Sequence, residues 1–236
     1  MQRYVVNILD RDVILSNDDI FHIKKVMRMK INSNIEVIYE GKVYLCRIVS
    51  LEPFKVEIIN IVEENHEIDG FIRLFYCLPK GGKLELVIQK AVEIGCNEIV
   101  LVNSERSIAK ISNDNVDKKL LRFQKIIKEA TEQSKREKQM ILKDVIEFKD
   151  IKTYSADFSF IAYERSDFKE DTLSEVLNTI KGKRVNIMVG AEGGFSNKEV
   201  EYAVNNGYKQ ISLGKRILRS ETACIYALSL LSFYMD

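Results

Sequence analysis

The segment Val189–Ala203, VGAEGGFSNKEVEYA, joins two elements of different character. The apolar run 184–189 leads into it, which predicts a buried strand. Ser196 and Glu199 have the spacing of a capping box, which predicts that a helix begins there. Between them lie glycines, which permit positive φ and let the main chain approach a ligand closely. The segment therefore predicts a strand, a glycine-rich loop and a helix in succession.

The same succession extends on both sides of this segment. The expected strands are 71–78, 97–102, 158–164, 184–189 and 208–213, and the expected helices are 83–94, 116–136, 172–181, 197–205 and 220–235. A capping box at Thr172–Glu175 opens one of these helices. Strands that alternate with helices indicate an α/β fold with a mostly parallel sheet and helices on both faces. The last helix is apolar nearly all round, so we expect it in the core or at a subunit interface.

The first part of the chain has a different pattern. Apolar-rich runs separated by turn residues predict strands at 4–8, 34–40, 43–52 and 55–64. Several short strands in a small space suggest a compact β-barrel. A short helix is expected at 18–27, with Asp18 or Asp19 as its cap. The polar segment 63–70 is the expected linker, so the predicted domains are 1–68 and 69–236.

Bulk composition restricts the possible classes. The net charge of +1 over 236 residues does not by itself predict a polyanionic partner. Two locally basic runs, 22–30 and 116–138, fit either a nucleic-acid surface or solvated helix faces. The four cysteines are scattered without CxxC spacing and there are two histidines, so neither disulfides nor a metal site is expected. The sequence shows no membrane-spanning run and no signal peptide, so a cytoplasmic protein is expected.

Two loops occupy the positions where open parallel sheets bind ligands, beyond the carboxyl ends of strands. They are 190–196 and 213–223, after two strands that we expect to be neighbours. A phosphate site is the first alternative, because a helix N-terminus offers free N–H groups. However, neither GxxxxGK[ST] nor GxGxxG in the required context is present.

Four segments resemble the signature segments of the bacterial 16S ribosomal RNA uridine N3-methyltransferases. They are PKGGKLELVIQKAVEIGCNEIV (79–100), EATEQSKR (129–136), GAEGGFSNKE (190–199) and LGKRILRSETA (213–223). That family belongs to the SPOUT class of S-adenosylmethionine-dependent RNA methyltransferases. Two prolines usual in the family are missing here: Ala191 replaces one, and none follows Arg136 closely. Their loss removes local rigidity rather than chemistry.

The resemblance implies a SPOUT-type domain with a knotted parallel sheet, preceded by a small PUA-like β-barrel that binds RNA. It also implies S-adenosylmethionine as cofactor, small-subunit ribosomal RNA as partner, and a homodimer with its active site at the subunit interface. The knot is a rare exception to the rule that chains are not knotted. The implied cofactor contacts are Met188, Gly190, Gly193, Leu213, Gly214, Ile217, Leu218, Thr222 and Ala223.

The uridine N3–H is a weak acid, so its methylation needs proton removal or stabilisation of the developing anion. We expect Arg219 and Arg136 to stabilise the anion. Glu192 and Glu221 are candidates for the base, although Glu192 could instead bind loop N–H groups and Glu221 could lie in the first turn of the last helix. Arg3 and Arg28 are expected to contact the RNA backbone. Two alternatives stay open: a SPOUT enzyme that acts on another RNA base, and an inactive RNA-binding assembly factor.

Overall fold

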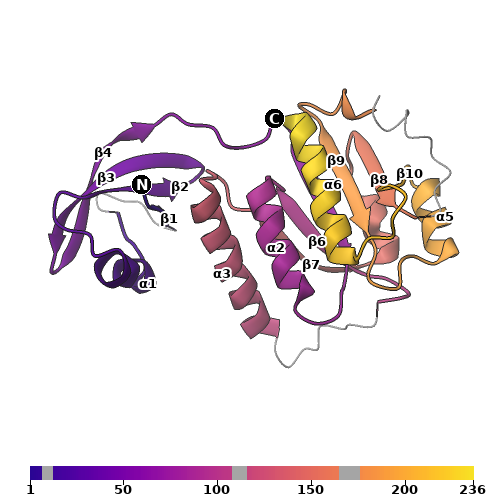
Figure 1. Cartoon of the computed structure of the whole chain (residues 1–236), viewed down its shortest axis with the longest axis horizontal. Coiled ribbons are helices and arrows are strands. Elements are labelled where there is room, and N and C mark those ends of the chain that lie inside the picture. The colour runs from indigo at the N-terminus through magenta and orange to yellow at the C-terminus, as the bar shows by residue number, and fades with distance from the viewer. Residues whose placement is uncertain (7–12, 108–115, 165–175) are drawn as a thin grey trace. The chain divides into compact units, whose positions relative to one another are not determined.

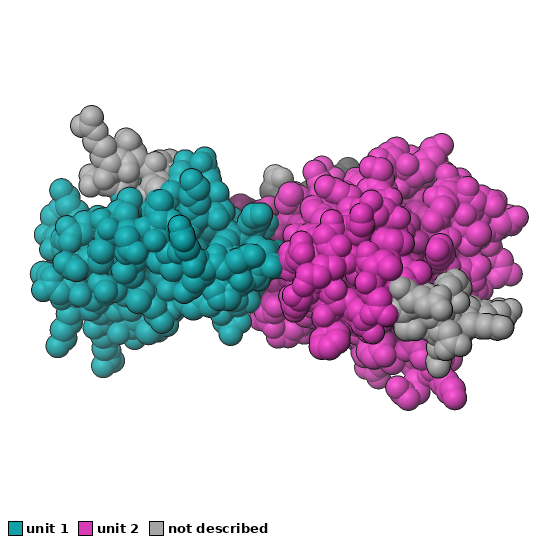
Figure 2. All heavy atoms as spheres, turned by 90° about the horizontal axis from the view of Figure 1, so that it is seen from above, with its two compact units in different colours: residues 1–67, 128–139 teal, residues 68–127, 140–236 magenta. Residues whose placement is uncertain are grey.

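The computed structural model describes residues 1–6, 13–107, 116–164 and 176–236. These residues form two compact units, coloured separately in Figure 2. One unit joins 1–67 to 128–139, and the other joins 68–127 to 140–236. The capping box expected at Thr172–Glu175 lies outside the described residues.

The second unit is built on a sheet of six strands in the order β10-β8-β9-β5-β6-β7 (Figure 1). The strands are β5 Phe71–Cys77, β6 Glu98–Asn103, β7 Ile141–Glu147, β8 Phe158–Ala162, β9 Arg184–Val189 and β10 Lys209–Ile211. Every pairing in this sheet is parallel. The carboxyl ends of all its strands therefore meet at one edge, where loops from distant parts of the sequence come together.

One face of this sheet is covered by α2 Lys83–Ile94 and α6 Ser220–Met235, which pack against each other. α6 also packs on β5 and β9. The Tyr76 hydroxyl on this face lies 3.1 Å from the Ser220 Oγ at the start of α6. An almost wholly apolar α6 fits this position, because its buried side faces the sheet and α2 together.

The opposite face carries α5 Asn197–Asn205 and the 3-10 helix η3 Phe148–Thr153. Phe75 lies next to Tyr76 in the strand and therefore points to this other face. There it joins a buried cluster that includes Phe148 and Val200. The expected α/β sheet with helices on both faces is confirmed.

Local signals in the sequence fix two helix ends as expected. The Ser196 Oγ accepts from the Glu199 N–H at 3.3 Å, and Glu199 accepts from the Ser196 N–H at 2.8 Å, so both halves of the capping box form. α2 ends at Gly95, whose φ of 101° is in the left-handed region that favours glycine.

Two features of the sheet differ from the expectation. β7 and η3 were not expected, because β7 is an edge strand with mostly exposed residues and lacks a clear apolar alternation. The strands before the two glycine-containing loops, β9 and β10, are not neighbours, since β8 lies between them. The sequence order of strands carries no information about this insertion.

The first unit contains a four-stranded sheet in the order β1-β2-β3-β4. The strands are β1 Arg3–Val5, β2 Asn34–Tyr39, β3 Lys42–Leu51 and β4 Phe54–Val62. β1 pairs with β2 in parallel, and the other pairs are antiparallel. Among residues 1–6 and 13–67, β1 and β4 are the outer strands of this small sheet.

A short helix packs into the core of this sheet through Ile23. It begins as α1 Asn17–Phe21 and continues as the π-helical turn η1 His22–Val26. The cap is Ser16, whose Oγ accepts from the Asp19 N–H at 3.1 Å, while Asp19 supplies the other half of the capping box. The expected cap at Asp18 or Asp19 was therefore one helical turn too late.

Segment 128–139 groups with the first unit through buried polar contacts. It contains the end of α3 Val116–Ser134 and the residues that follow. The Arg136 guanidinium donates to both carboxylate oxygens of Glu67, the shortest contact being 2.7 Å. Glu67 also accepts from the N–H groups of Glu137 and Lys138, at 3.1 and 3.0 Å. The expected linker is thus anchored, not free.

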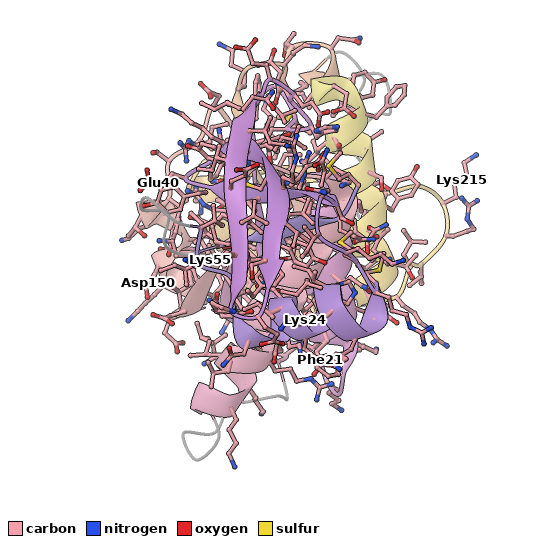
Figure 3. The ribbon with its side chains drawn as sticks, turned by 90° about the vertical axis from the view of Figure 1, so that its left-hand side faces the viewer. Phe21, Lys24, Glu40, Lys55, Asp150 and Lys215 are labelled. Carbon is pink, nitrogen blue, oxygen red and sulfur yellow. The ribbon has the colours of Figure 1, made fainter. Side chains whose placement is uncertain are left out.

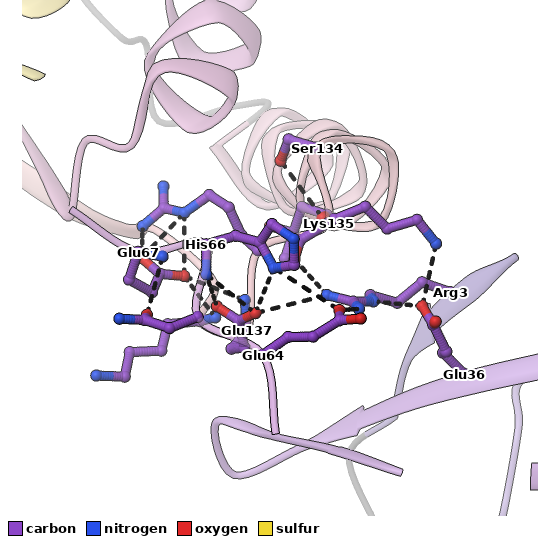
Figure 4. A network of polar contacts seen from close by, with 12 residues as sticks. Arg3, Glu36, Glu64, His66, Glu67, Ser134, Lys135 and Glu137 are labelled. Carbon is purple, nitrogen blue, oxygen red and sulfur yellow. Dashed lines mark hydrogen bonds and ion pairs between the residues drawn. The ribbon is translucent and has the colours of Figure 1, made fainter. Parts of the chain in front are cut away.

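Arg3 occupies the other end of this network (Figure 4). Its Nε donates to Glu36 at 2.8 Å, its Nη2 to Glu64 at 2.9 Å, and its Nη1 to the main-chain carbonyl of Lys135. The Arg3 side chain is fully buried. Charges removed from water in this way are tolerated only when they are paired and hydrogen-bonded.

These contacts modify the domain boundary expected from the sequence. Residues 128–139 fall inside the range 69–236, yet they group with 1–67. The amphipathic pattern of a helix shows that one side is buried but not which partner buries it. No helix among the described residues is long and apolar enough to cross a bilayer. All four cysteines are free and buried.

Candidate functional site

A cavity of about 450 Å³ lies at the carboxyl edge of the six-stranded sheet. It is formed by the loops that follow β8, β9 and β10, together with the start of α2. The lining residues are Lys83, Ala162, Tyr163, Glu164, Val189, Gly190, Ala191, Glu192, Gly193, Gly194, Phe195, Leu213, Gly214, Arg216, Ile217, Leu218, Arg219, Ser220 and Ala223. Parallel sheets bind ligands at this edge, so the position agrees with the expectation from the two loops.

The glycine loop after β9 turns back on itself. Gly194 has φ of 62°, and its N–H donates to the Ala191 carbonyl at 2.9 Å. A Cβ atom on Gly190 would lie 3.2 Å from the main chain of Gly194, so the close approach requires glycine there. Ala191, which replaces a proline usual in the resembled family, is buried in the core. The loop thus presents main chain, rather than side chains, to the cavity.

Glu192 connects this loop to the segment that opens α2. Its carboxylate accepts from the Lys83 ammonium at 2.8 Å and from the Lys80 N–H at 3.2 Å. Burial by itself would raise the pKa of Glu192, but these hydrogen bonds outweigh it and hold the pKa below its ordinary value. A carboxyl group with a lowered pKa is a weaker base. The structure therefore favours the alternative role, binding of loop N–H groups, over a general base.

Lys83 also bridges toward the start of α6. Its ammonium lies 3.5 Å from the Glu221 carboxylate, so it lies between an acid of the glycine loop and an acid of the first turn of α6. The hydrogen bond with Glu192 raises the pKa of Lys83 above its ordinary value. Lys83 thus links the glycine loop to the start of α6.

The loop after β10 supplies the other wall. Gly214 has φ of 102°, and its N–H donates to the Ser212 Oγ at 3.3 Å. Ile217 lines the cavity, yet 87% of its surface is exposed. Its side chain therefore offers apolar surface to a ligand. Arg219 lines the same wall next to α6, and Lys215 projects outward from the loop (Figure 3).

Most of the residues expected to contact a cofactor line this cavity. They are Gly190, Gly193, Leu213, Gly214, Ile217, Leu218 and Ala223. Met188 does not, because its side chain is fully buried in the core cluster that also holds Phe75. Thr222 is exposed on α6 and lies outside the lining. The segments expected from the motif match line the cavity. A motif match does not show which way each side chain points, so Met188 and Thr222 differ from the expectation.

Two expected roles of arginines change. Arg136 is 2% exposed and paired with Glu67 inside the first unit. Its guanidinium therefore makes a structural contact, and the structure does not support its expected role as anion stabiliser. Arg3 is equally buried and bound by Glu36 and Glu64, which leaves no exposed face for a phosphate. Arg28, in contrast, is exposed and keeps its expected position on the surface.

Sequence reasoning missed the parts of the site that carry no glycine motif. Lys83 had not been selected, and Tyr163 and Glu164 follow β8, whose place between β9 and β10 was not expected. The expected strand 158–164 included Tyr163 and Glu164, whereas β8 ends at Ala162, so these two residues lie beyond its carboxyl end.

Known proteins resemble this chain over nearly its whole length. The family described as RNA methyltransferase domain matches residues 66–232, and that described as RNA methyltransferase PUA domain matches 15–59. Ribosomal RNA small subunit methyltransferase E of Bacillus subtilis is 33% identical, covering 100% of this chain and 98% of that protein. The protein of the same name from Mesomycoplasma hyopneumoniae is 37% identical, covering 97% and 98%.

A solved structure shares the fold across both units. Ribosomal RNA small subunit methyltransferase E from Neisseria gonorrhoeae, bound to S-adenosyl methionine, gives a TM-score of 0.82 at 28% identity. The match covers 99% of this chain and 97% of that one. The chain therefore belongs to the family of RNA methyltransferases with an N-terminal PUA domain that includes ribosomal RNA small subunit methyltransferase E.

Proposed function

We propose that this protein uses S-adenosylmethionine to methylate N3 of a uridine in the 16S RNA of the small ribosomal subunit. The observation that carries the proposal is the cavity at the carboxyl sheet edge. Its walls are the segments 190–195 and 213–220, which resemble the signature segments of the uridine N3-methyltransferases. The related protein from Neisseria gonorrhoeae is described as bound to S-adenosyl methionine.

The residues of the cavity fit such a cofactor. Its volume of about 450 Å³ is in the range of small-molecule sites. Leu213, Ile217 and Leu218 offer apolar surface suited to an adenine ring, and the glycine loop offers main-chain polar groups.

Bound S-adenosylmethionine supplies an activated methyl group, and its sulfur keeps the electron pair of the carbon–sulfur bond as the methyl passes to uridine N3. The chain must hold N3 in line with that methyl group, and positioning of this kind supplies much of the rate gain. The N3 proton leaves to water before the methyl group passes. Negative charge then develops on the uracil, and a nearby guanidinium such as that of Arg219 lowers the barrier.

The proposal includes a homodimer and a trefoil knot. α6 keeps an exposed apolar stripe, with Tyr226 at 48% and Phe233 at 77% exposure, and Leu86 is exposed on the adjoining α2. A stripe of this kind on a helix beside the cavity suits contact with a second copy. The loops 190–195 and 213–220 line one cavity, which is the arrangement expected of the two knot segments.

The first unit is proposed to dock the RNA. Lys25, Arg28 and Lys30 are exposed, and they follow in sequence the exposed Phe21, which lies on the same helical segment as Lys24 (Figure 3). Lys24 itself is paired with Glu52 at 2.6 Å. Exposed cations and an exposed ring in one short segment suit a single-stranded RNA, which offers both phosphates and bases.

The direct test is methyl transfer to small subunits that lack the modification, followed by mass analysis of the nucleosides. We expect 3-methyluridine in the 16S RNA. A methyl group on another base would show that this is a SPOUT enzyme of different specificity. Normal RNA binding without any methyl transfer would support an assembly factor and contradict the proposal.

Gly214→Ala should weaken the binding of S-adenosylmethionine at least tenfold. Alanine disfavours the positive φ of residue 214, so the main chain of the loop should shift away from the position that binds the cofactor. Gly207→Ala is the matched control: Gly207 has φ of 88° and lies after α5, away from the cavity. Neither Cβ meets a described atom within 4 Å, so each change should cost about 1 kcal/mol of stability. Calorimetry beside urea unfolding measures both effects, and equal cofactor binding in the two variants would contradict the assignment.

Combined replacement of the exposed cations, Lys25→Gln, Arg28→Asn and Lys30→Gln, should weaken RNA binding and leave cofactor binding unchanged. Asparagine is chosen because Arg28 has φ of 51°, which asparagine tolerates. A salt titration of RNA binding should lose a slope of about 1 for each phosphate contact removed.

The control variant removes the same charge elsewhere, through Lys149→Gln, Lys152→Gln and Lys209→Gln at exposed positions of the second unit. If both variants lower RNA affinity and slope equally, the effect is general charge loss and the docking surface is wrongly placed.

Phe233→Glu should turn the dimer into a monomer and abolish methyl transfer, because it places a charge in the proposed apolar contact. Val204→Glu, at an exposed position of α5, is the control and should remain dimeric. Light scattering measures the mass of each variant. A wild-type protein that is monomeric at micromolar concentration contradicts the dimer directly.

A further inference from the structure

Arg106 lies beside the proposed cofactor loop, although no motif pointed to it. It belongs to the loop Ser104–Ser107, which follows β6 and therefore sits at the same carboxyl edge of the sheet as the cavity. Its Nη1 donates to the main-chain carbonyl of Gly193 at 3.0 Å. Gly193 is a lining residue of the cavity, so one carbonyl group separates this guanidinium from the cavity wall.

The loop that carries Arg106 is braced at several points. The Ser104 Oγ lies 2.7 Å from the Ser107 Oγ, and the Ser107 N–H donates to the Ser104 carbonyl at 3.0 Å. The Glu105 N–H donates at 2.7 Å to Glu199, the buried carboxylate that also caps α5. Arg106 therefore extends from a fixed main chain that is tied to the helix after the glycine loop.

Gly193 lies in close contact with Arg106. A Cβ atom on Gly193 would lie 3.1 Å from the Arg106 Cβ and 3.4 Å from its carbonyl oxygen. The two loops are thus in close main-chain contact, and a larger residue at 193 would push them apart. The close contact with Arg106 explains why residue 193 is glycine. The same contact places the Arg106 guanidinium beside the loop that lines the cavity.

The state of the Arg106 side chain distinguishes it from the buried arginines. Arg3, Arg73 and Arg136 are all buried and paired with carboxylates. Arg106 is exposed, and no ion pair joins it to a carboxylate within the described parts of the chain. A guanidinium has five N–H donors, and one of those of Arg106 is used by the Gly193 carbonyl. The remaining donors suit an anionic oxygen that arrives from outside.

We propose that Arg106 is a catalytic residue that binds the uracil oxygen on which negative charge develops when N3–H ionises ahead of methyl transfer. This inference rests on the proposed function. The N3 proton first leaves to water, so that the negative charge spreads over the uracil ring and its oxygens. The N3–carbon bond then forms as the carbon–sulfur bond breaks with its electron pair on sulfur, which leaves both products neutral at these atoms. A fixed cation lowers the energy of the charged ring without taking the proton, because a guanidinium remains protonated.

The test compares Arg106→Gln, Arg106→Lys and the wild type in the full-length protein. Removal of one donor to a developing oxyanion typically lowers kcat by about 100-fold, so that loss is expected for Arg106→Gln. Arg106→Lys should restore part of kcat because it keeps the charge. The Kd for S-adenosylmethionine should stay within about threefold of wild type, on the premise that Arg106 contacts the uracil and not the cofactor.

The pH dependence separates this role from a purely structural one. A cation beside the uracil lowers the pKa of the bound N3–H, so its loss should move the rising limb of the pH–rate profile to higher pH. A residue that only shapes the loop would lower the rate at every pH and leave the profile in place.

Arg184→Gln is the matched control. Arg184 is an exposed arginine at the amino end of β9, the sheet edge opposite the cavity, with its guanidinium 4.0 Å from the centre of the Phe71 ring. It should keep kcat within about twofold of wild type, because it lies away from the proposed site.

Three results would overturn the inference: an unchanged kcat with a raised KM, which indicates a phosphate contact; a parallel loss of cofactor binding, which indicates loop positioning; or an unshifted pH profile. A wild type that methylates a base other than uridine contradicts the proposed function, whereas an active wild type with an equally active Arg106→Gln contradicts only this inference.

Discussion

Parallel pairing in the second unit is the constraint on which the rest depends. Because all six strands point the same way, their carboxyl ends form one edge, and loops far apart in sequence are brought together there. The loops after β8, β9 and β10 can then enclose a single cavity. Because residue 190 is glycine, its main chain can lie in van der Waals contact with the main chain of Gly194. The loop can therefore offer main-chain groups to a small ligand.

Buried and exposed basic side chains differ in their partners. In the first unit Arg3 and Arg136 are buried and neutralised by carboxylates, and they hold segment 128–139 to the remainder of that unit. At the cavity Arg106 and Arg219 are exposed, while Lys83 holds Glu192 in place. The buried charges stabilise by pairing, and only the exposed ones are available to an RNA.

The sequence predicted the elements better than their arrangement. Capping at Ser196 and the stop at Gly95 are local effects, so residues close in sequence determine them. The insertion of β8 between β9 and β10 and the grouping of 128–139 with the first unit depend on tertiary contacts that no local pattern encodes. The same limit explains why Arg136, which lies in a signature segment, was expected at the active site. Its partner Glu67 lies 69 positions away.

Hydrogen exchange with and without S-adenosylmethionine tests the central claim most directly, because it maps the bound region on the full chain without any substitution. The account predicts slower exchange at 190–195 and at 213–220 together, with the amides of the first unit unchanged. Protection confined to the first unit, or at only one of the two loops, would contradict a cofactor site at the carboxyl edge of the sheet.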